Sequence, residues 1–240
     1  MVSKNQIKLV KSLHQKKYRN RHNLFVAEGI KVVSELVASD FKVNAVYSTD
    51  AEIEVGAAGL VELVSEVELK KMSALTTPNK VLGVFEIPKA RKPDLTGWVL
   101  VLDDVRDPGN LGTIIRLCDW FGIEHLVCSL NTVDCYNPKT LQATMGSISR
   151  VNIGYTDLPT FLEGVPSDIY GAFMDGVSVY TKAMPESGIL VMGNEANGVS
   201  KEVEALVSRK ISIPQFGKNT TESLNVATAT AILLNEIRRG

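Results

Sequence analysis

The chain has 240 residues, of which 45% are hydrophobic and 22% are charged, and its formal net charge is −1. It is long enough for one large or two small hydrophobic cores, and its composition is that of an ordinary globular protein. Three scattered cysteines argue against a disulfide framework or a structural zinc site, and no apolar run approaches the roughly 18 residues of a membrane helix. We therefore expect a cytoplasmic protein that uses no metal.

The N-terminal segment is basic and has a helical pattern. Residues 1–22 contain lysines and arginines but no aspartate or glutamate. Ser3 and Gln6 have the spacing of a capping box, and Ile7, Val10 and Leu13 then recur at helical intervals. We expect an amphipathic helix that ends near residue 16. Its cations can form a phosphate-binding surface, although a solvated helix face explains this pattern nearly as well.

Alternating strands and helices are expected between residues 24 and 87. The expected strands are residues 24–27, 43–48, 60–64 and 81–87, and the expected helices begin at Gly29 and near residue 66. This alternation is typical of a small α/β domain. The proline-, glycine- and charge-rich residues 88–97 then indicate a linker. The predicted domains are residues 1–90 and 98–240, joined by a linker of residues 91–97.

The second domain repeats the alternation. Its expected strands are residues 98–104, 125–129, 168–173, 189–193 and 211–214, and a long helix is expected over residues 223–239. Glycine-containing turns follow three of these strands, with the sequences DPGNLGTIIR, VMGNEANGVS and IPQFGKNTTESLNVATA. Glycine lets the backbone approach a ligand closely, and ligands of open α/β sheets bind at the carboxyl ends of strands. Taken singly, each turn is better explained as an ordinary loop or helix cap.

Several common catalytic motifs are absent from the sequence. No GxGxxG follows the first strand of either domain, and neither GxxxxGK[ST] nor GxSxG occurs. A Rossmann dehydrogenase, a P-loop nucleotide hydrolase and a serine hydrolase therefore lack their sequence evidence.

Together, and in this order, the three turns resemble the motifs of the SpoU-type (TrmH-like) RNA ribose methyltransferases of the SPOUT superfamily. Motif one is matched by Asn110, Gly112 and Arg116, and motif two by Gly193, Glu195 and Gly198. Motif three is matched by Pro214, Gly217, Ser223, Leu224 and Asn225. The basic N-terminal helix, with KKYR and FVAEG, more weakly resembles the family's L30e-like RNA-binding domain.

The resemblance implies an α/β fold in which the second domain is a parallel sheet with a deep trefoil knot, an exception to the usual avoidance of knots. S-adenosylmethionine would bind in the knot at Gly193, Ile213 and Leu224, and the protein would act as a homodimer with its active site at the interface. The implied catalytic residues are Arg116, Asn110, Glu195, Ser223 and Asn225. The implied RNA-binding residues are Lys8, Lys11, Lys16, Lys17 and Arg19.

The implied reaction is methyl transfer to a ribose 2′-OH, and the L30e-like extension favours ribosomal RNA as the substrate. Arginine keeps its proton at neutral pH, so we interpret Arg116 as a cation that binds phosphate and stabilises the alkoxide; a general-base role stays open. Ala196, Gln142 and the extra residues KNTTE depart from the family pattern and affect substrate contacts more than the cofactor site. The alternatives are a tRNA methyltransferase, or a non-catalytic RNA-binding or ribosome-assembly protein on the same scaffold.

Overall fold

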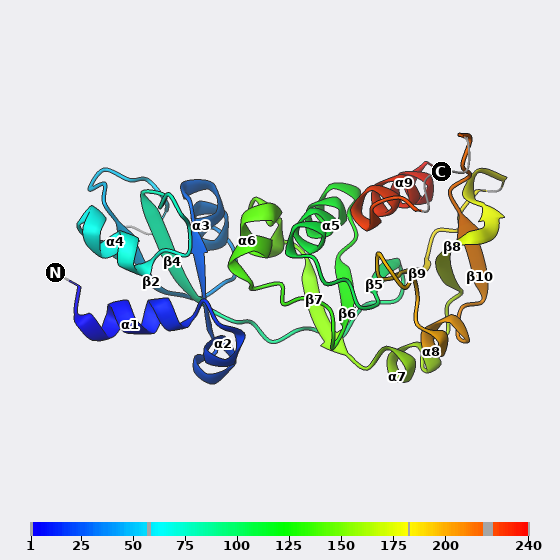
Figure 1. Ribbon diagram of the computed structural model, residues 1–240, viewed down its shortest axis with the longest axis horizontal. Coiled ribbons are helices and arrows are strands. Elements are labelled where there is room, and N and C mark those ends of the chain that lie inside the picture. Colours follow the sequence, from blue (N-terminus) through cyan, green and yellow to red (C-terminus); the bar gives the residue numbers. More distant parts are fainter. Residues whose placement is uncertain (1, 57–58, 182, 218–222, 240) are drawn as a thin grey trace. The chain divides into compact units, whose positions relative to one another are not determined.

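A computed structural model describes residues 2–56, 59–181, 183–217 and 223–239, and it shows an α/β fold made of two compact units (Figure 1). Unit 1 consists of Met1–Lys89 with Asp134–Arg150, and unit 2 consists of Ala90–Val133 with Val151–Gly240. The sequence placed residues 134–150 in the second domain, whereas in the structure they pack with unit 1. Within the described ranges, none of the helices combines the length and the apolar character needed to cross a membrane.

Unit 1 contains a four-stranded mixed sheet. Its strands are β1 (Leu24–Glu28), β2 (Val43–Ser48), β3 (Val61–Leu63) and β4 (Val81–Glu86), paired in the order β1-β4-β2-β3 with only β2 and β3 parallel. Its helices are α1 (Lys4–Ser12), α2 (Lys16–His22), α3 (Ile30–Val37), α4 (Glu66–Met72) and α6 (Pro138–Thr144). The predicted strands of this region are therefore present, within one or two residues of their predicted bounds.

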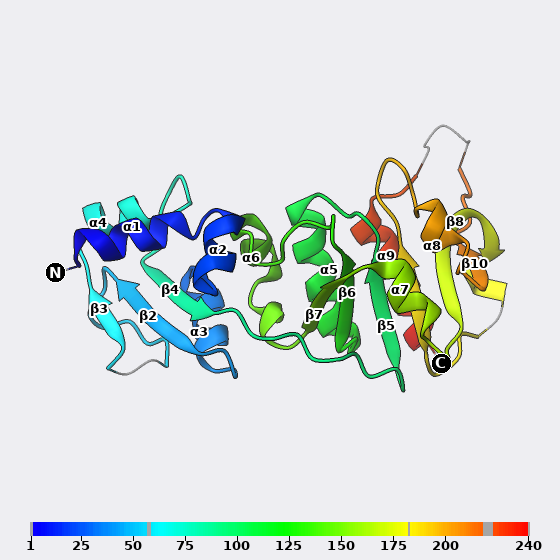
Figure 2. The same ribbon diagram turned by 90° about the horizontal axis from the view of Figure 1, so that it is seen from below.

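Alternation along the strands of unit 1 produces two packed faces. Leu82 and Val84 of β4 join a core with α1 and α4, whereas Phe85 and Gly83 point to the opposite face, where Gly83 approaches Val33 of α3. Figure 2 shows α1 and α4 together on one side of this sheet and α3 on the other. The α1 helix has the predicted capping box at its start but ends at Ser12, earlier than expected, and a separate helix α2 follows.

Unit 2 contains a six-stranded parallel sheet. Its strands are β5 (Trp98–Leu102), β6 (His125–Ser129), β7 (Asn152–Thr156), β8 (Ile169–Ser178), β9 (Gly188–Met192) and β10 (Arg209–Ser212), paired in the order β10-β8-β9-β5-β6-β7. Every residue of β5, β6 and β9 is buried, because these strands are covered on both faces. The structure confirms the predicted parallel α/β sheet; β7 was not predicted.

Two layers of helices cover this sheet (Figure 1). On one side lie α5 (Pro108–Phe121) and α9 (Val226–Arg238), which contact each other. On the other side lie α7 (Leu158–Glu163) and α8 (Lys201–Glu204), whose apolar residues join Val99, Val101 and Val191 in one core. The turns that carry the three motifs leave β5, β9 and β10 at their carboxyl ends, as expected of a ligand site in this fold.

Candidate active site

Side chains from all three motifs form one hydrogen-bonded chain in unit 2. The amide nitrogen of Asn225 donates to Oδ1 of Asn110 over 2.9 Å, and Nδ2 of Asn110 donates to Oε1 of Glu195 over 2.7 Å. The other end of the chain is fixed, because Oδ1 of Asn225 accepts from the backbone nitrogens of Ala227 and Thr228. The structure thus brings together three of the five predicted catalytic residues.

Helix capping explains how two of these residues are held. Asp107 caps α5 by accepting a hydrogen bond from the backbone nitrogen of Asn110, and Pro108 occupies the first turn, where a missing N–H costs nothing. Asn225 is itself the N-cap of α9. Each asparagine is therefore fixed by the start of a helix, and the contact between α5 and α9 brings the two together. Glu195 lies in the exposed turn that follows β9.

A cavity of about 980 Å³ lies beside this chain and is lined by motifs two and three. The predicted cofactor residues Gly193, Ile213 and Leu224 all line it, as do Glu195 and Ser223. Other lining residues, which the sequence did not suggest, include Phe173, Asp175 and Phe216. Asp175 was missed because the predicted strand ended at residue 173, whereas β8 continues to Ser178.

Gly193 is required by a close backbone approach at this cavity. A Cβ atom placed on Gly193 would lie 2.3 Å from both the carbonyl carbon of Gly198 and the nitrogen of Val199. The chain returns over Gly193 in this way because Asn194 and Gly198 pair through two backbone hydrogen bonds of 2.9 Å. Gly198 has a φ of +69°, a left-handed conformation that glycine adopts easily.

Arg116 is separate from the hydrogen-bonded chain. It is exposed on α5, and six residues of helix turn its side chain by about 120° from that of Asn110. Arg116 does not line the cavity, and among the described residues it has no ion-pair or hydrogen-bond partner. The carboxylate of Glu195 accepts its hydrogen bond from Asn110 instead of from Arg116.

Four of the five predicted RNA-binding residues are exposed cations of unit 1. Lys8 and Lys11 lie on α1, and Lys16 and Lys17 lie on α2. The ammonium group of Lys17 also lies 4.8 Å from the ring centroid of Tyr18. The apolar residues Ile7, Val10 and Leu13 face the core of unit 1, so the lysines remain on the solvent side of the helix.

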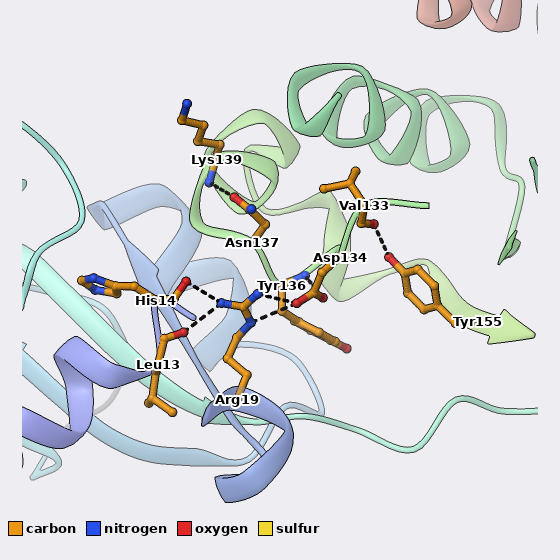
Figure 3. Close-up of polar contacts among 9 residues, drawn as sticks. All are labelled: Leu13, His14, Arg19, Val133, Asp134, Tyr136, Asn137, Lys139 and Tyr155. Carbon is orange, nitrogen blue, oxygen red and sulfur yellow. Dashed lines mark hydrogen bonds and ion pairs between the residues drawn. The ribbon is translucent and has the colours of Figure 1, made fainter. Parts of the chain in front are cut away.

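Arg19 differs from the other predicted RNA-binding residues, because only 3% of its side chain is exposed (Figure 3). Its guanidinium forms an ion pair with Asp134, with Nε donating to Oδ2 over 3.0 Å, and its Nη1 donates to the carbonyl oxygens of Leu13 and His14. These contacts use the guanidinium inside unit 1. The structure therefore removes Arg19 from the candidate RNA surface and gives it a structural position.

Comparisons with known proteins identify the family of the chain. The SpoU rRNA Methylase family model matches residues 97–235, and a model of an MRM3-like substrate binding domain matches residues 4–83. The 23S rRNA (guanosine(2553)-2′-O)-methyltransferase RlmP of Bacillus subtilis is 32% identical over 246 residues, which cover 98% of this chain and 97% of RlmP.

Solved structures give the same assignment. A TrmH-family protein of Porphyromonas gingivalis is 38% identical with a TM-score of 0.91, covering 100% of this chain and 99% of that one. An AdoMet-bound rRNA methyltransferase of Sinorhizobium meliloti is 30% identical with a TM-score of 0.86, covering 100% of this chain and 97% of that one. The three motifs, the parallel sheet and these similarities together show that the chain belongs to the SpoU family of RNA methylases.

Proposed function

We propose that this protein transfers a methyl group from S-adenosylmethionine to a ribose 2′-OH of ribosomal RNA. The observation that carries the proposal is the series of side-chain hydrogen bonds Asn225–Asn110–Glu195, which joins all three motifs at the edge of a cavity. Relatives that match nearly the whole chain support the substrate class, since RlmP is named for 2′-O-methylation of a guanosine in 23S rRNA. A further relative, of Streptomyces viridochromogenes, is named for a uridine of 23S rRNA and is 27% identical over 92% of this chain.

The cavity fits S-adenosylmethionine in size and in the chemistry of its walls. About 980 Å³ is at the upper end of the range for small-molecule sites. Ile213 and Leu224 offer apolar surface to an adenine ring, and the backbone that returns over Gly193 offers N–H and C=O groups. When bound, S-adenosylmethionine supplies a methyl group activated by the positive charge of its sulfur. The trefoil knot of the family is part of this proposal for unit 2.

The protein's own residues position the ribose and the charge that develops on it. Glu195, held by Asn110, can accept a hydrogen bond from a ribose hydroxyl, and Ser223 at the cavity wall can donate one. Methylation of the 2′-oxygen would release the hydroxyl proton, which would pass to an RNA phosphate or to solvent. Arg116 binds that phosphate and stabilises the alkoxide character of the oxygen.

A homodimer explains why Arg116 lies away from the cavity of its own chain. On α5, Arg116 is exposed and has no partner among the described residues, whereas Asn110 is held at the other motifs. An interface between two copies would bring Arg116 of one copy to a ribose bound beside the other. Sedimentation or light scattering tests this arrangement, with a monomer at assay concentrations as the contradicting result.

The N-terminal lysines provide the proposed RNA-docking surface. Each phosphate contact that is lost should flatten the dependence of log affinity on log salt by about 0.7–0.9. We therefore expect Lys8→Gln with Lys11→Gln to lower RNA affinity and to reduce this slope by roughly 1.5. An unchanged slope would mean that α1 is only a solvated helix face.

The decisive test is transfer of tritiated methyl groups from S-adenosylmethionine to total RNA from a strain that lacks the gene. We expect incorporation into ribosomal RNA, followed by mapping of the new 2′-O-methyl mark. Incorporation into tRNA alone would replace the proposed substrate, and no incorporation together with no cofactor binding by calorimetry would leave a non-catalytic RNA-binding protein.

In the pH–rate profile of Arg116→Lys, a new lysine ionisation with substantial turnover would favour the base role over the electrostatic one.

A further inference from the structure

Asp104 has a strained backbone conformation beside the proposed active site. Its φ is +58°, a left-handed value that non-glycine residues rarely adopt, and it lies two residues after the end of β5. Such a conformation persists only where the surroundings hold it. Ser129 accepts a hydrogen bond of 2.9 Å from the backbone nitrogen of Asp104, and Arg106 donates one of 2.8 Å to its carboxylate.

A further contact of Asp104 comes from motif two. Nδ2 of Asn194 donates to the carbonyl oxygen of Asp104 over 2.7 Å. Oδ1 of the same side chain accepts from the backbone nitrogens of Ala196 and Asn197, over 2.9 Å and 3.1 Å. Because Oδ1 has two N–H donors, the amide orientation is fixed and only the NH2 group can face Asp104. Asn194 therefore joins the turn after β9 to the turn after β5.

Glu195 is the next residue in this turn. Its carboxylate accepts a hydrogen bond from Asn110, which lies six residues after Asp104 in the sequence. A second link runs in parallel, since the carboxylate of Asp103 accepts a hydrogen bond of 2.7 Å from the backbone nitrogen of Ser200. The turn that carries Glu195 is thus tied at residues 194 and 200 to Asp104 and Asp103, in the segment between β5 and motif one.

We propose that Asn194 is a positioning residue. By donating to the carbonyl oxygen of Asp104, whose backbone is left-handed, it fixes Glu195 against Asn110. The inference rests on the proposed function for its kinetic consequence but not for its structural one. Asn194→Asp is the sharpest change, because a carboxylate can still accept from Ala196 and Asn197 but puts an oxygen against the Asp104 carbonyl. The turn keeps its internal hydrogen bonds and its link through Ser200, and it loses only the attachment at residue 194.

The experiment is a double-mutant cycle of Asn194→Asp and Glu195→Gln, measured as kcat and KM for ribosomal RNA. Asn194→Asp should lower kcat about tenfold in the wild-type background and less than about twofold in the Glu195→Gln background. The second loss is smaller because Asn194 acts through Glu195, which has already been changed. Cofactor affinity by calorimetry should change less than kcat does. Asn235→Asp, the same chemical change at an exposed position of α9, is the matched control. Independent losses in the two backgrounds would overturn the proposal.

Hydrogen exchange gives a readout that does not need activity. Deuterium uptake of residues 192–200 should rise in Asn194→Asp relative to Asn235→Asp, and unchanged uptake would overturn the proposal even if the wild type proved inactive. If the wild type transfers no methyl group but uptake rises, the proposed function fails and the positioning contact stands. Should Asn194→Asp fail to fold, Asn194→Ser is measured instead, because its hydroxyl can still cap the turn.

Discussion

The buried ion pair between Arg19 and Asp134 should control the stability of unit 1. Replacing Arg19 by alanine leaves the carboxylate of Asp134, which is 13% exposed, without its cation. It also leaves the carbonyl oxygens of Leu13 and His14, each 2.9 Å from Nη1, without that donor. Breaking one side of a buried pair costs about 3–5 kcal/mol. Since Asp134 keeps some solvent contact, we expect about 3 kcal/mol.

This loss is large enough to measure in urea. With an unfolding slope of about 1.5 kcal/mol per molar for a domain of this size, the midpoint of unit 1 should fall by about 2 M. Both tryptophans, Trp98 and Trp120, belong to unit 2, so their fluorescence follows that unit. Hydrogen exchange in β1 and β4 follows unit 1. Arg19→Ala should therefore move the exchange transition more than the fluorescence transition.

Arg21→Ala is the matched control, because Arg21 is an exposed cation of the same helix α2. A midpoint for Arg19→Ala equal to that of Arg21→Ala would refute the structural role. Reduced RNA affinity without lost stability would return Arg19 to the RNA surface. Replacing the pair jointly, as Arg19→Met with Asp134→Leu, should cost less than Arg19→Ala, because no uncompensated charge is then buried.

Three further predictions follow from individual contacts. Gly193→Ala should abolish cofactor binding in calorimetry, because its Cβ would lie 2.3 Å from backbone atoms of Gly198; wild-type affinity would contradict the tight return of the chain. Asn225→Ala should lower unfolding stability by about 1 kcal/mol, since it removes the cap of α9, and should lower kcat through Asn110; a change in stability alone would exclude the catalytic contact. Burial lowers the pKa of His14 from its ordinary value of 6.5, and the nearby charge of Glu28 opposes this shift. The fold therefore favours the neutral form of His14, so the free energy of unfolding should decrease as pH falls below about 6.5. His14→Gln should flatten this part of the stability–pH curve, and an unchanged curve would contradict the assignment.

Local sequence patterns predicted most of the secondary structure. Apolar runs such as WVLVL and HLVCS predicted β5 and β6 because strands of a covered parallel sheet are apolar on both faces. The Ser3 and Gln6 spacing predicted the start of α1, because a capping box satisfies the free backbone N–H groups of a helix start. The end of α1 at Ser12 was not predicted, nor was the contact just beyond it, where the carbonyl oxygens of Leu13 and His14 accept hydrogen bonds from Arg19. A contact of this kind has no local sequence signal.

The sequence by itself determined the family, the α/β class and the three glycine-containing turns, because these depend on residue types at fixed short spacings. The tertiary structure alone decided which of those residues meet. Asn110, Glu195 and Asn225 are joined only because β5, β9 and α9 bring three distant segments to one edge of a sheet. By the same principle, Arg19 looked like a surface cation in the sequence but is buried against Asp134, a residue 115 positions away.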